Sequence, residues 1–397
     1  MFTDLKPLPA DPILGLSVLF QADTNPRKVD LGVGIYKDDA GATPIMGSIR
    51  SAYAALAESE ASKAYVSPMG WPGYTEACMK MVLGEQFAAS NSDQLAAIQT
   101  PGGCGALRLG FDLVAASNPA TTVWVSDPTW ANHVPIITAA GLPSKQYGYY
   151  DGESGLVDID AMLNSLKEAK AGDVVLLHAC CHNPTGADLS SHGWQKAIEL
   201  MLEKGLFPFI DMAYHGFATG LEDDVQEVRS AFAAIPELLL SYSCSKNFGL
   251  YRERAGALIA KGASDTASPA LATNMAKIAR QSYSMPPAHG AALVTTVLNN
   301  PVLRSAWEAE LASMRSRIIT LRRGLDSALT TLGAAGRLGN IANQNGMFSL
   351  LNLNPEQVLH LQKECAIYMP GNGRINIAGL TADNIPYVAE SLNALLN

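Results

Sequence analysis

Short apolar segments alternate with amphipathic helical patterns through the middle of this chain. The apolar segments lie at 95–100, 122–125, 173–177, 206–210 and 238–240, and helical patterns follow the first three of them. Apolar segments without a polar face, joined by helices, are typical of a mostly parallel sheet that helices cover on both faces. The sequence therefore predicts an α/β fold with a doubly wound sheet.

The pattern changes near Leu311, where a long amphipathic segment carries several arginines among apolar residues. Shorter strand-like segments follow it. A chain of 397 residues also exceeds the size at which a single core stops growing, about 250–300 residues. We therefore expect a large domain over 44–313, a smaller α+β domain over 314–397, and an N-terminal arm over 1–43 that packs partly with the small domain.

Charge and composition exclude several classes of partner. The formal net charge is −9, from 28 Lys and Arg against 37 Asp and Glu, so the chain offers no basic surface for a nucleic acid. No run approaches 18 apolar residues, and the first residues lack the pattern of a leader peptide. The six cysteines, two of them adjacent at 180 and 181, do not form a disulfide framework. We expect a cytoplasmic protein with no membrane partner.

Polar residues follow all five predicted strands. In open α/β sheets, ligands bind outside the carboxyl ends of the strands, so these residues should meet at one site. The polar stretches are TPGGCGALR, SDPTW, HACCHNPTG, DMAYHG and SYSCSK.

Taken one by one, these stretches are ambiguous. The glycine-rich turn at 101–108 opens a helix and suits a phosphate, but an ordinary loop has the same composition. Asp211 follows a buried strand, where it needs a cation or several donors, yet a helix cap or a structural hydrogen bond would also explain it. The HACCH sequence at 178–182 contains zinc-ligand residue types, but it lacks a second ligand pair, so no metal site is predicted.

Lys246 stands among small hydroxyl and thiol residues between two predicted strands. Such a lysine is either a surface turn residue or an amine held in a site. Arg254, Arg280 and Arg374 are each of a kind that is usually solvated. Together with Asp211 and the phosphate-suited turn, however, the lysine and an arginine form the set that pyridoxal 5′-phosphate requires.

The stretch SYSCSKNFGLYRERAG resembles the cofactor-attachment signature of the class I pyridoxal-phosphate-dependent aminotransferases. HNPTG, DMAYHGF, SDPTWANH and RINIAGL resemble further landmarks of that family, in the same order. The resemblance runs from 11–16 to the C-terminus and is closest to the aspartate and aromatic-amino-acid aminotransferases. It implies fold type I of the pyridoxal-phosphate-dependent transferases.

The resemblance implies a role for each residue around the cofactor ring. Lys246 is the Schiff-base lysine and, once freed, the base that moves the substrate's Cα proton. Asp211 pairs with the pyridine nitrogen. The remaining ring contacts are His133 and His178 behind that aspartate, Tyr214 and Asn183 at the phenolic oxygen, and Trp130 on the ring face.

The resemblance also implies two anion sites and a homodimer. The phosphate is bound by Arg254, Ser243, Ser245, Gly103 and Cys104, with Tyr65 supplied by the neighbouring subunit. The substrate's α-carboxylate is bound by Arg374, Trp130, Asn183 and the backbone near Gly34. Arg280 of the neighbouring subunit meets the distal carboxylate of dicarboxylic substrates.

Several positions depart from the family's usual residues. Cys104 replaces a hydroxyl residue, and a thiol is a weaker donor to phosphate. Met285 and Ala64 make the rim of the site more apolar than in aspartate-selective members, whereas Lys37 and Thr43 follow the aspartate pattern. We expect a dual-specificity enzyme that passes the amino group of aromatic amino acids or aspartate to 2-oxoglutarate.

Other activities remain open at this stage. A strict aspartate aminotransferase is the second interpretation. A β-lyase or decarboxylase with the same cofactor would need no arginine for a distal carboxylate, and a nicotinamide dehydrogenase is supported by the glycine-rich turn alone. In the aminotransferase interpretation, nearby arginine charge and partial desolvation should lower the pKa of Lys246.

Overall fold

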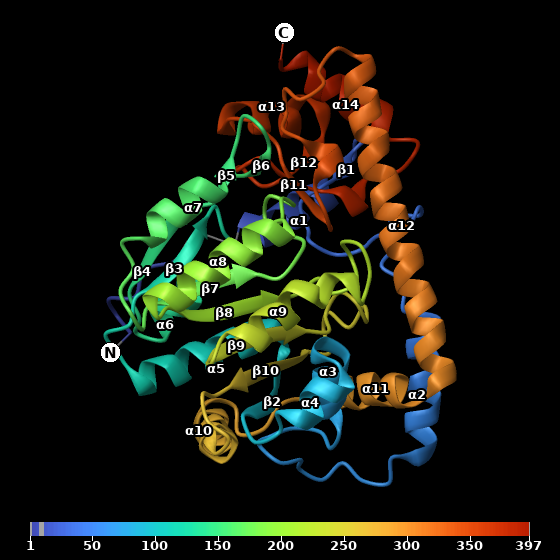
Figure 1. Cartoon of the computed structure of the whole chain (residues 1–397). Helices are drawn as coiled ribbons and strands as arrows, with labels where there is room; N and C mark the ends of the chain where they lie inside the picture. Colours follow the sequence, from blue (N-terminus) through green and yellow to red (C-terminus); the bar gives the residue numbers. More distant parts are fainter. Residues whose placement is uncertain (1, 8–11, 397) are drawn as a thin grey trace.

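The computed structural model describes residues 2–7 and 12–396 of the chain, and its centre is a seven-stranded sheet (Figure 1). All neighbouring strands are parallel except those that pair with β10, which is antiparallel to both β2 and β9. In spatial order the strands are β2 (Leu95–Pro101), β10 (Ala255–Lys261), β9 (Leu238–Ser243), β8 (Phe207–Met212), β7 (Val174–His178), β3 (Val123–Asp127) and β4 (Ser144–Gly148). The predicted mostly parallel α/β sheet is confirmed.

The central strands are apolar on both faces because helices cover both. One face packs on the cluster that includes α5 and α10, and α8 and α9 lie over the other face (Figure 1). The helices of the sheet domain are α2 (Gly47–Ser59), α3 (Tyr74–Leu83), α4 (Glu85–Ser90), α5 (Gly102–Ser117), α6 (His133–Ala139), α7 (Ile159–Leu166), α8 (Ser191–Lys204), α9 (Gln226–Ala234), α10 (Ala267–Ser282) and α11 (Ala288–Asn299).

Strand β4 was missed in the sequence analysis. It forms the edge of the sheet beside β3, and two of its five residues, Lys145 and Gln146, are exposed. An edge strand with polar side chains lacks the continuous apolar run by which buried strands are recognised. The two short strands β5 (Tyr150–Asp151) and β6 (Leu156–Val157) form a separate antiparallel pair.

The C-terminal part of the chain forms a smaller unit beside the sheet. It contains two two-stranded pairs, β11 with β13 and β1 with β12, so the N-terminal segment joins the C-terminal unit through β1. Its elements are α1 (Pro12–Ala22), β1 (Val29–Asp30), β11 (Phe348–Leu350), α13 (Pro355–Cys365), β12 (Ile367–Tyr368), β13 (Arg374–Asn376) and α14 (Ile385–Ala394).

Helix α12 (Pro301–Thr331) runs without interruption along one side of the molecule, from α2 and α11 to the C-terminal unit (Figure 1). The domain boundary predicted near residue 313 falls inside this helix. The division into 1–43, 44–313 and 314–397 stays a prediction, and residues 1, 8–11 and 397 lie outside the described residues.

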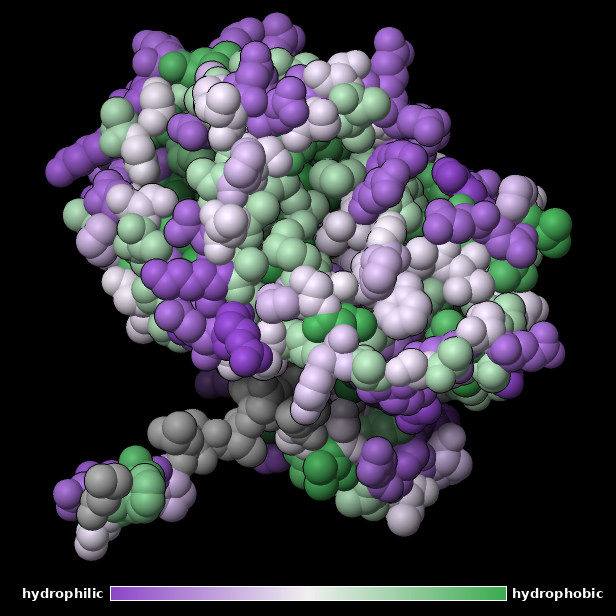
Figure 2. Space-filling view, turned by 90° about the horizontal axis from the view of Figure 1, so that it is seen from below, coloured by the Kyte–Doolittle hydropathy of each residue, from purple (hydrophilic) through white to green (hydrophobic). Residues whose placement is uncertain are grey.

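The described N-terminal residues 2–7 project from the body of the molecule, as Figure 2 shows. Phe2 and Leu5 in this segment are exposed, at 75% and 73%. Among the described residues, no helix combines the length and the apolar character that crossing a membrane requires.

Candidate active site

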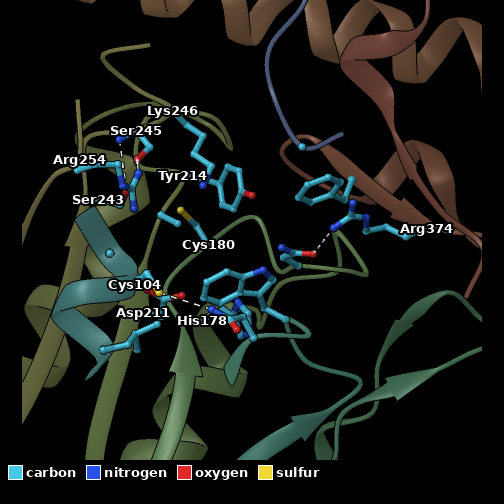
Figure 3. Close-up of a pocket in the computed structure, with 18 residues that line it drawn as sticks. Cys104, His178, Cys180, Asp211, Tyr214, Ser243, Ser245, Lys246, Arg254 and Arg374 are labelled. Carbon is cyan, nitrogen blue, oxygen red and sulfur yellow. Dashed lines mark hydrogen bonds between the residues drawn. The ribbon is translucent and has the colours of Figure 1, made fainter. Parts of the chain in front are cut away.

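A cavity of about 290 Å³ opens at the carboxyl ends of the parallel strands, next to the first turn of α5 (Figure 3). It brings together residues from the sheet, from the loop after β9 and from the C-terminal unit. The predicted site residues that line it are Gly34, Gly103, Cys104, Trp130, His178, Asn183, Asp211, Tyr214, Ser243, Ser245, Lys246, Arg254 and Arg374.

Sheet register places one wall of this cavity. His178 lies opposite Asp211 on neighbouring strands, and Asp211 lies opposite Ser241 on the next strand. Gly256, two residues after Arg254, pairs with Ser243. Polar side chains that are far apart in the sequence are thus brought to one edge of the sheet because their strands end there.

The first turn of α5, Arg254 and two serines form a cradle suited to an anion. The Gly102 amide donates to the carbonyl of Arg254 (3.0 Å), and the Arg254 guanidinium donates to Ser245 Oγ (3.4 Å). A Cβ on Gly102, whose φ is +70°, would lie 2.5 Å from the Arg254 guanidinium, and a Cβ on Gly103 would lie 3.1 Å from Ser243 Cβ. Gly102 is therefore required for the close approach of the helix and the arginine, and a side chain at 103 would crowd Ser243.

The thiol of Cys104 lies in the same first turn of α5. Asn132 donates to its sulfur at 3.5 Å, and burial raises the pKa of the thiol. Cys104 is therefore a neutral, weak donor at this end of the cavity.

Lys246 extends from the loop after β9 into the middle of the cavity, with its ammonium 5.0 Å from the centre of the Tyr214 ring. Withdrawal from water lowers the pKa of Lys246 to about 8, against the opposing effect of Asp211, and the charges of Arg254 and Arg374 lower it further. The predicted depression is confirmed, with burial as its main cause. Near neutral pH the amine can be deprotonated at small cost.

Asp211 is buried at the end of β8 and accepts a hydrogen bond from His133 Nε2 at 3.3 Å. Burial acts to raise the pKa of this carboxyl, but the hydrogen bonds from His133 and Ser241 and the electrostatic interaction with the neighbouring imidazoles outweigh it. The pKa of Asp211 is therefore held below its ordinary value. A buried carboxylate that stays charged can hold a proton on a neighbouring ring nitrogen.

The histidines behind Asp211 lie in a row. The His133 and His178 rings meet edge-on with centroids 5.1 Å apart, and the His178 and His182 rings are tilted by 42° with centroids 4.0 Å apart. Burial lowers the pKa of His178 to about 3, so this imidazole is neutral. In the ranges 2–7 and 12–396, no cluster of His, Cys, Asp and Glu side chains has the arrangement of a metal site.

Arg374 forms the opposite wall of the cavity, away from the Arg254 cradle (Figure 3). Its guanidinium donates to Asn183 Oδ1 (3.3 Å) and to the Gly32 carbonyl (2.7 Å), and it lies 4.3 Å from the centre of the Phe348 ring. Its Nε is buried and has no hydrogen-bond partner in the described part of the chain. A buried guanidinium held by neutral groups, with a donor to spare, suits a carboxylate ligand.

Three predicted site residues do not line the cavity. His133 lies behind Asp211. Tyr65 is 92% exposed, and the exposed Arg280 contacts Ser284 on its own helix end. The last two were assigned to a neighbouring subunit, and these assignments stay predictions.

The cavity also contains residues that the sequence analysis did not assign. These are Leu107, Asn132, Cys180, Ala213 and Phe348. Four of them stand within or next to the polar stretches that were singled out, so their strand-end position was a usable signal. Phe348 was interpreted only as part of a strand, since an apolar residue in an apolar segment carries no sign of a site.

Comparisons with known proteins show which family this chain resembles in sequence and in fold. The family model "Aminotransferase class I and II" matches residues 26–392. The chain is 45% identical to an aspartate aminotransferase of Escherichia coli, over 100% of both chains, and 46% identical to an aromatic-amino-acid aminotransferase of Paracoccus denitrificans, over 99% of both. A crystal structure of an aromatic-amino-acid aminotransferase from Burkholderia pseudomallei, covalently bound to pyridoxal phosphate, superposes with a TM-score of 0.96 at 38% identity, over 100% of both chains.

Proposed function

The chain belongs to the class I and II aminotransferases, and on that basis we propose that it transfers the amino group of aromatic amino acids and of aspartate to 2-oxoglutarate. The cofactor that the family implies is pyridoxal 5′-phosphate. The observation that carries the proposal is the meeting of Lys246, Asp211 and Arg374 in one cavity, with an anion cradle at its far end.

The residues present fit this cofactor. The cradle of Arg254, Ser243, Ser245 and the α5 N-terminus has the donors for a phosphate, and its two glycines leave room that any side chain would fill. Asp211 would face the pyridine nitrogen, backed by His133. The other cofactor contacts that we propose are Trp130, His178, Asn183, Tyr214, Gly103, Cys104 and, from a second copy, Tyr65.

When bound, pyridoxal phosphate supplies an electron sink that stabilises negative charge on the substrate's Cα. The chain's own residues would then position the substrate and move its proton. Lys246 would take the Cα proton and return it one carbon away, and its pKa of about 8 supports this role in both directions. Asp211, charged at neutral pH, would keep a proton on the ring nitrogen. Tyr214 would donate to the phenolic oxygen.

The substrate's α-carboxylate would bind Arg374, whose guanidinium donates to Asn183 and whose Nε has no hydrogen-bond partner among the described residues; Gly34 lines the same cavity. Arg280 of a second copy would bind the distal carboxylate of aspartate, glutamate or 2-oxoglutarate. For aromatic substrates the apolar Met285 and Ala64 would tolerate a ring. The aspartate-type Lys37, in an ion pair with Asp30 at 2.7 Å, supports strict aspartate specificity as the second candidate.

The active unit would be a homodimer with shared sites. The 92% exposed ring of Tyr65 supports this proposal, because the side chain can reach the site of a second copy. The six free cysteines support a cytoplasmic location, where thiols stay reduced.

Steady-state kinetics would test the proposed function. We expect a yellow purified protein with kcat/KM values for aspartate, phenylalanine, tyrosine and tryptophan within about two orders of magnitude of each other, with 2-oxoglutarate as acceptor. Activity with aspartate alone would favour the second candidate. Loss of the side chain or carboxyl group from the substrate, without amino transfer, would contradict both.

A further inference from the structure

Helix α12 contacts the segments that carry Lys246 and Phe348, yet none of the described residues that line the cavity comes from 301–331. The helix runs beside the sheet at its first half and beside the C-terminal unit at its second half (Figure 1). Two buried side chains, Trp307 and Arg322, make its contacts to the segments that carry Lys246 and Phe348.

Trp307 holds the loop that carries Lys246. Its indole Nε1 donates to the backbone carbonyl of Asn247, the residue after Lys246, at 2.7 Å. Its ring stacks on Phe248 with centroids 4.4 Å apart and planes at 6°. Trp307, Asn247 and Phe248 are all fully buried. The hydrogen bond and the ring stacking therefore hold Asn247 and Phe248, the two residues that follow Lys246, in one position and orientation.

Arg322 holds the segment that carries Phe348. Its guanidinium donates to the carbonyls of Ile341 (3.2 Å), Gly346 (2.6 Å) and Phe348 (2.9 Å), and to Ser349 Oγ (2.5 Å). The side chain is 2% exposed, and every one of these partners is neutral. Burying an arginine among neutral hydrogen-bond partners is costly, and the charge of Asp188 offsets part of that cost. The four hydrogen bonds hold the segment against the guanidinium.

Phe348 joins this segment to Arg374, the residue that we propose binds the substrate's α-carboxylate. Its ring lies 4.3 Å under the Arg374 guanidinium and meets the Tyr214 ring edge-on at 5.8 Å. A Cβ on Gly34 would come within 2.7 Å of the Phe348 ring, so the ring occupies the space that the absent side chain leaves. A shift of the 341–349 segment would displace Arg374 or leave it without its support.

We propose that α12 positions the Lys246 amine near its first contact and the Arg374 guanidinium near its second, with Trp307 and Arg322 as positioning residues. The inference rests on the proposed function. Fifteen residues of helix separate the two side chains, a rise of about 22 Å. Because both contacts come from one uninterrupted helix, α12 links the position of the Lys246 loop to that of the Phe348 segment. Catalysis depends on such positioning because a misplacement near 1 Å costs on the order of 10²-fold in rate.

The test uses two binding readouts that separate the two ends of α12. The first is the rate at which chain freed of cofactor takes up pyridoxal phosphate, followed by absorbance. The second is the Kd of the loaded enzyme for succinate, a dicarboxylate that has no amino group. Trp307→Phe keeps the stacked ring and removes the N–H donor. Arg322→Met keeps the length and removes the donors.

We expect a crossed pattern. Trp307→Phe should slow cofactor uptake on the order of tenfold and leave the succinate Kd within about twofold of the unmodified enzyme. Arg322→Met should weaken succinate binding on the order of tenfold and leave the uptake rate within about twofold, and Arg322→Lys should recover part of the affinity. Matched controls are Trp194→Phe, a buried indole on α8, and Arg323→Met, the exposed neighbour, and both should resemble the unmodified enzyme.

Equal losses of both readouts in both variants would show a general destabilisation and overturn the inference, as would two variants that match the unmodified enzyme. A failure of the proposed function is distinguishable from either result. In that case the unmodified chain itself would take up no pyridoxal phosphate and bind no succinate, and the inference would fall with it.

Discussion

The two walls of the cavity are built in different ways. The wall at Arg254 belongs to one sheet: β2, β10 and β9 are neighbours, and their register alone brings Gly102, Arg254 and Ser243 together. The wall at Arg374 joins distant parts of the chain. That arginine contacts Asn183, 191 residues away, and Gly32, 342 residues away.

This difference implies that the two walls bind different ligands. A wall inside one sheet is rigid and suits a group that stays bound, whereas a wall between two units can admit and release a ligand at each turnover. We therefore expect the Arg254 wall to hold the cofactor and the Arg374 wall to bind the substrate. Variants that change one wall at a time test this expectation.

Removing one arginine from each wall should give the largest and most distinct effects. Arg374→Ala should lower kcat/KM for all amino acid substrates about 10²- to 10³-fold, because a buried carboxylate loses its paired charge, and leave the cofactor Kd nearly unchanged. Arg254→Ala should weaken pyridoxal phosphate by a comparable factor. Cofactor titration and steady-state kinetics on both variants check this. Loss of cofactor from the Arg374 variant would contradict the division.

Arg280→Ala tests whether Arg280 from a second copy of the chain binds substrate together with the Arg374 wall. We expect kcat/KM for aspartate to fall on the order of 10²-fold while that for phenylalanine changes by less than about threefold, since only the dicarboxylate has a group for this arginine. Lys277→Ala, one turn earlier on the exposed face of α10, is the control. Equal losses for both substrates would refute a separate role in binding the distal carboxylate.

Cys104→Ser changes a single donor of the Arg254 wall and should have a smaller effect on cofactor binding. A hydroxyl is a better donor than a thiol, so the variant should bind pyridoxal phosphate about 2- to 10-fold more tightly, with kcat/KM ratios between substrates unchanged. Equilibrium titration of the cofactor-free chain measures this effect. Weaker binding by the serine variant would mean that the thiol makes a contact of its own.

The pH dependence of cofactor uptake should show the smallest effect of the four. Only the neutral amine of Lys246 is a nucleophile, and its pKa is lowered to about 8, so the uptake rate should rise with pH through a midpoint near 8. In Arg374→Ala one of the charges that lower this pKa is gone, and the midpoint should move upward. Stopped-flow absorbance from pH 6 to 10 measures both curves. A midpoint above 10 would mean that the amine is not perturbed.

Sequence reasoning succeeded where the sheet decides the position of a residue. Asp211, His178 and Ser243 each end a buried apolar strand, and parallel strands bring such ends together, so their meeting needed no knowledge of the rest of the fold. Arg374 and Asn183 meet across two units of the structure, and periodicity contains no signal for that contact. Asn183 was placed at the site by its strand-end stretch, whereas the role of Arg374 was predicted only through the resemblance to aminotransferases.

Other features could not be predicted from the sequence, for physical reasons. Strand β4 is polar at the sheet edge, and Phe348 is an ordinary apolar residue whose importance comes from the guanidinium above it. The contacts of α12 with the Lys246 loop and with the Phe348 segment join residues 60 apart, from Trp307 to Asn247, and 24 to 27 apart, from Arg322 to the 346–349 segment. None of these contacts leaves a pattern in the sequence.

The central claim is that the amine of Lys246 binds the cofactor covalently, and peptide mapping tests it most directly. The purified yellow protein is treated with borohydride, digested and analysed by mass spectrometry. We predict that the mass of one reduced pyridoxal phosphate group is found on Lys246, and that Lys246→Ala carries none. A reduced cofactor group on another lysine, or a Lys246→Ala variant that keeps the covalent group, would contradict the account.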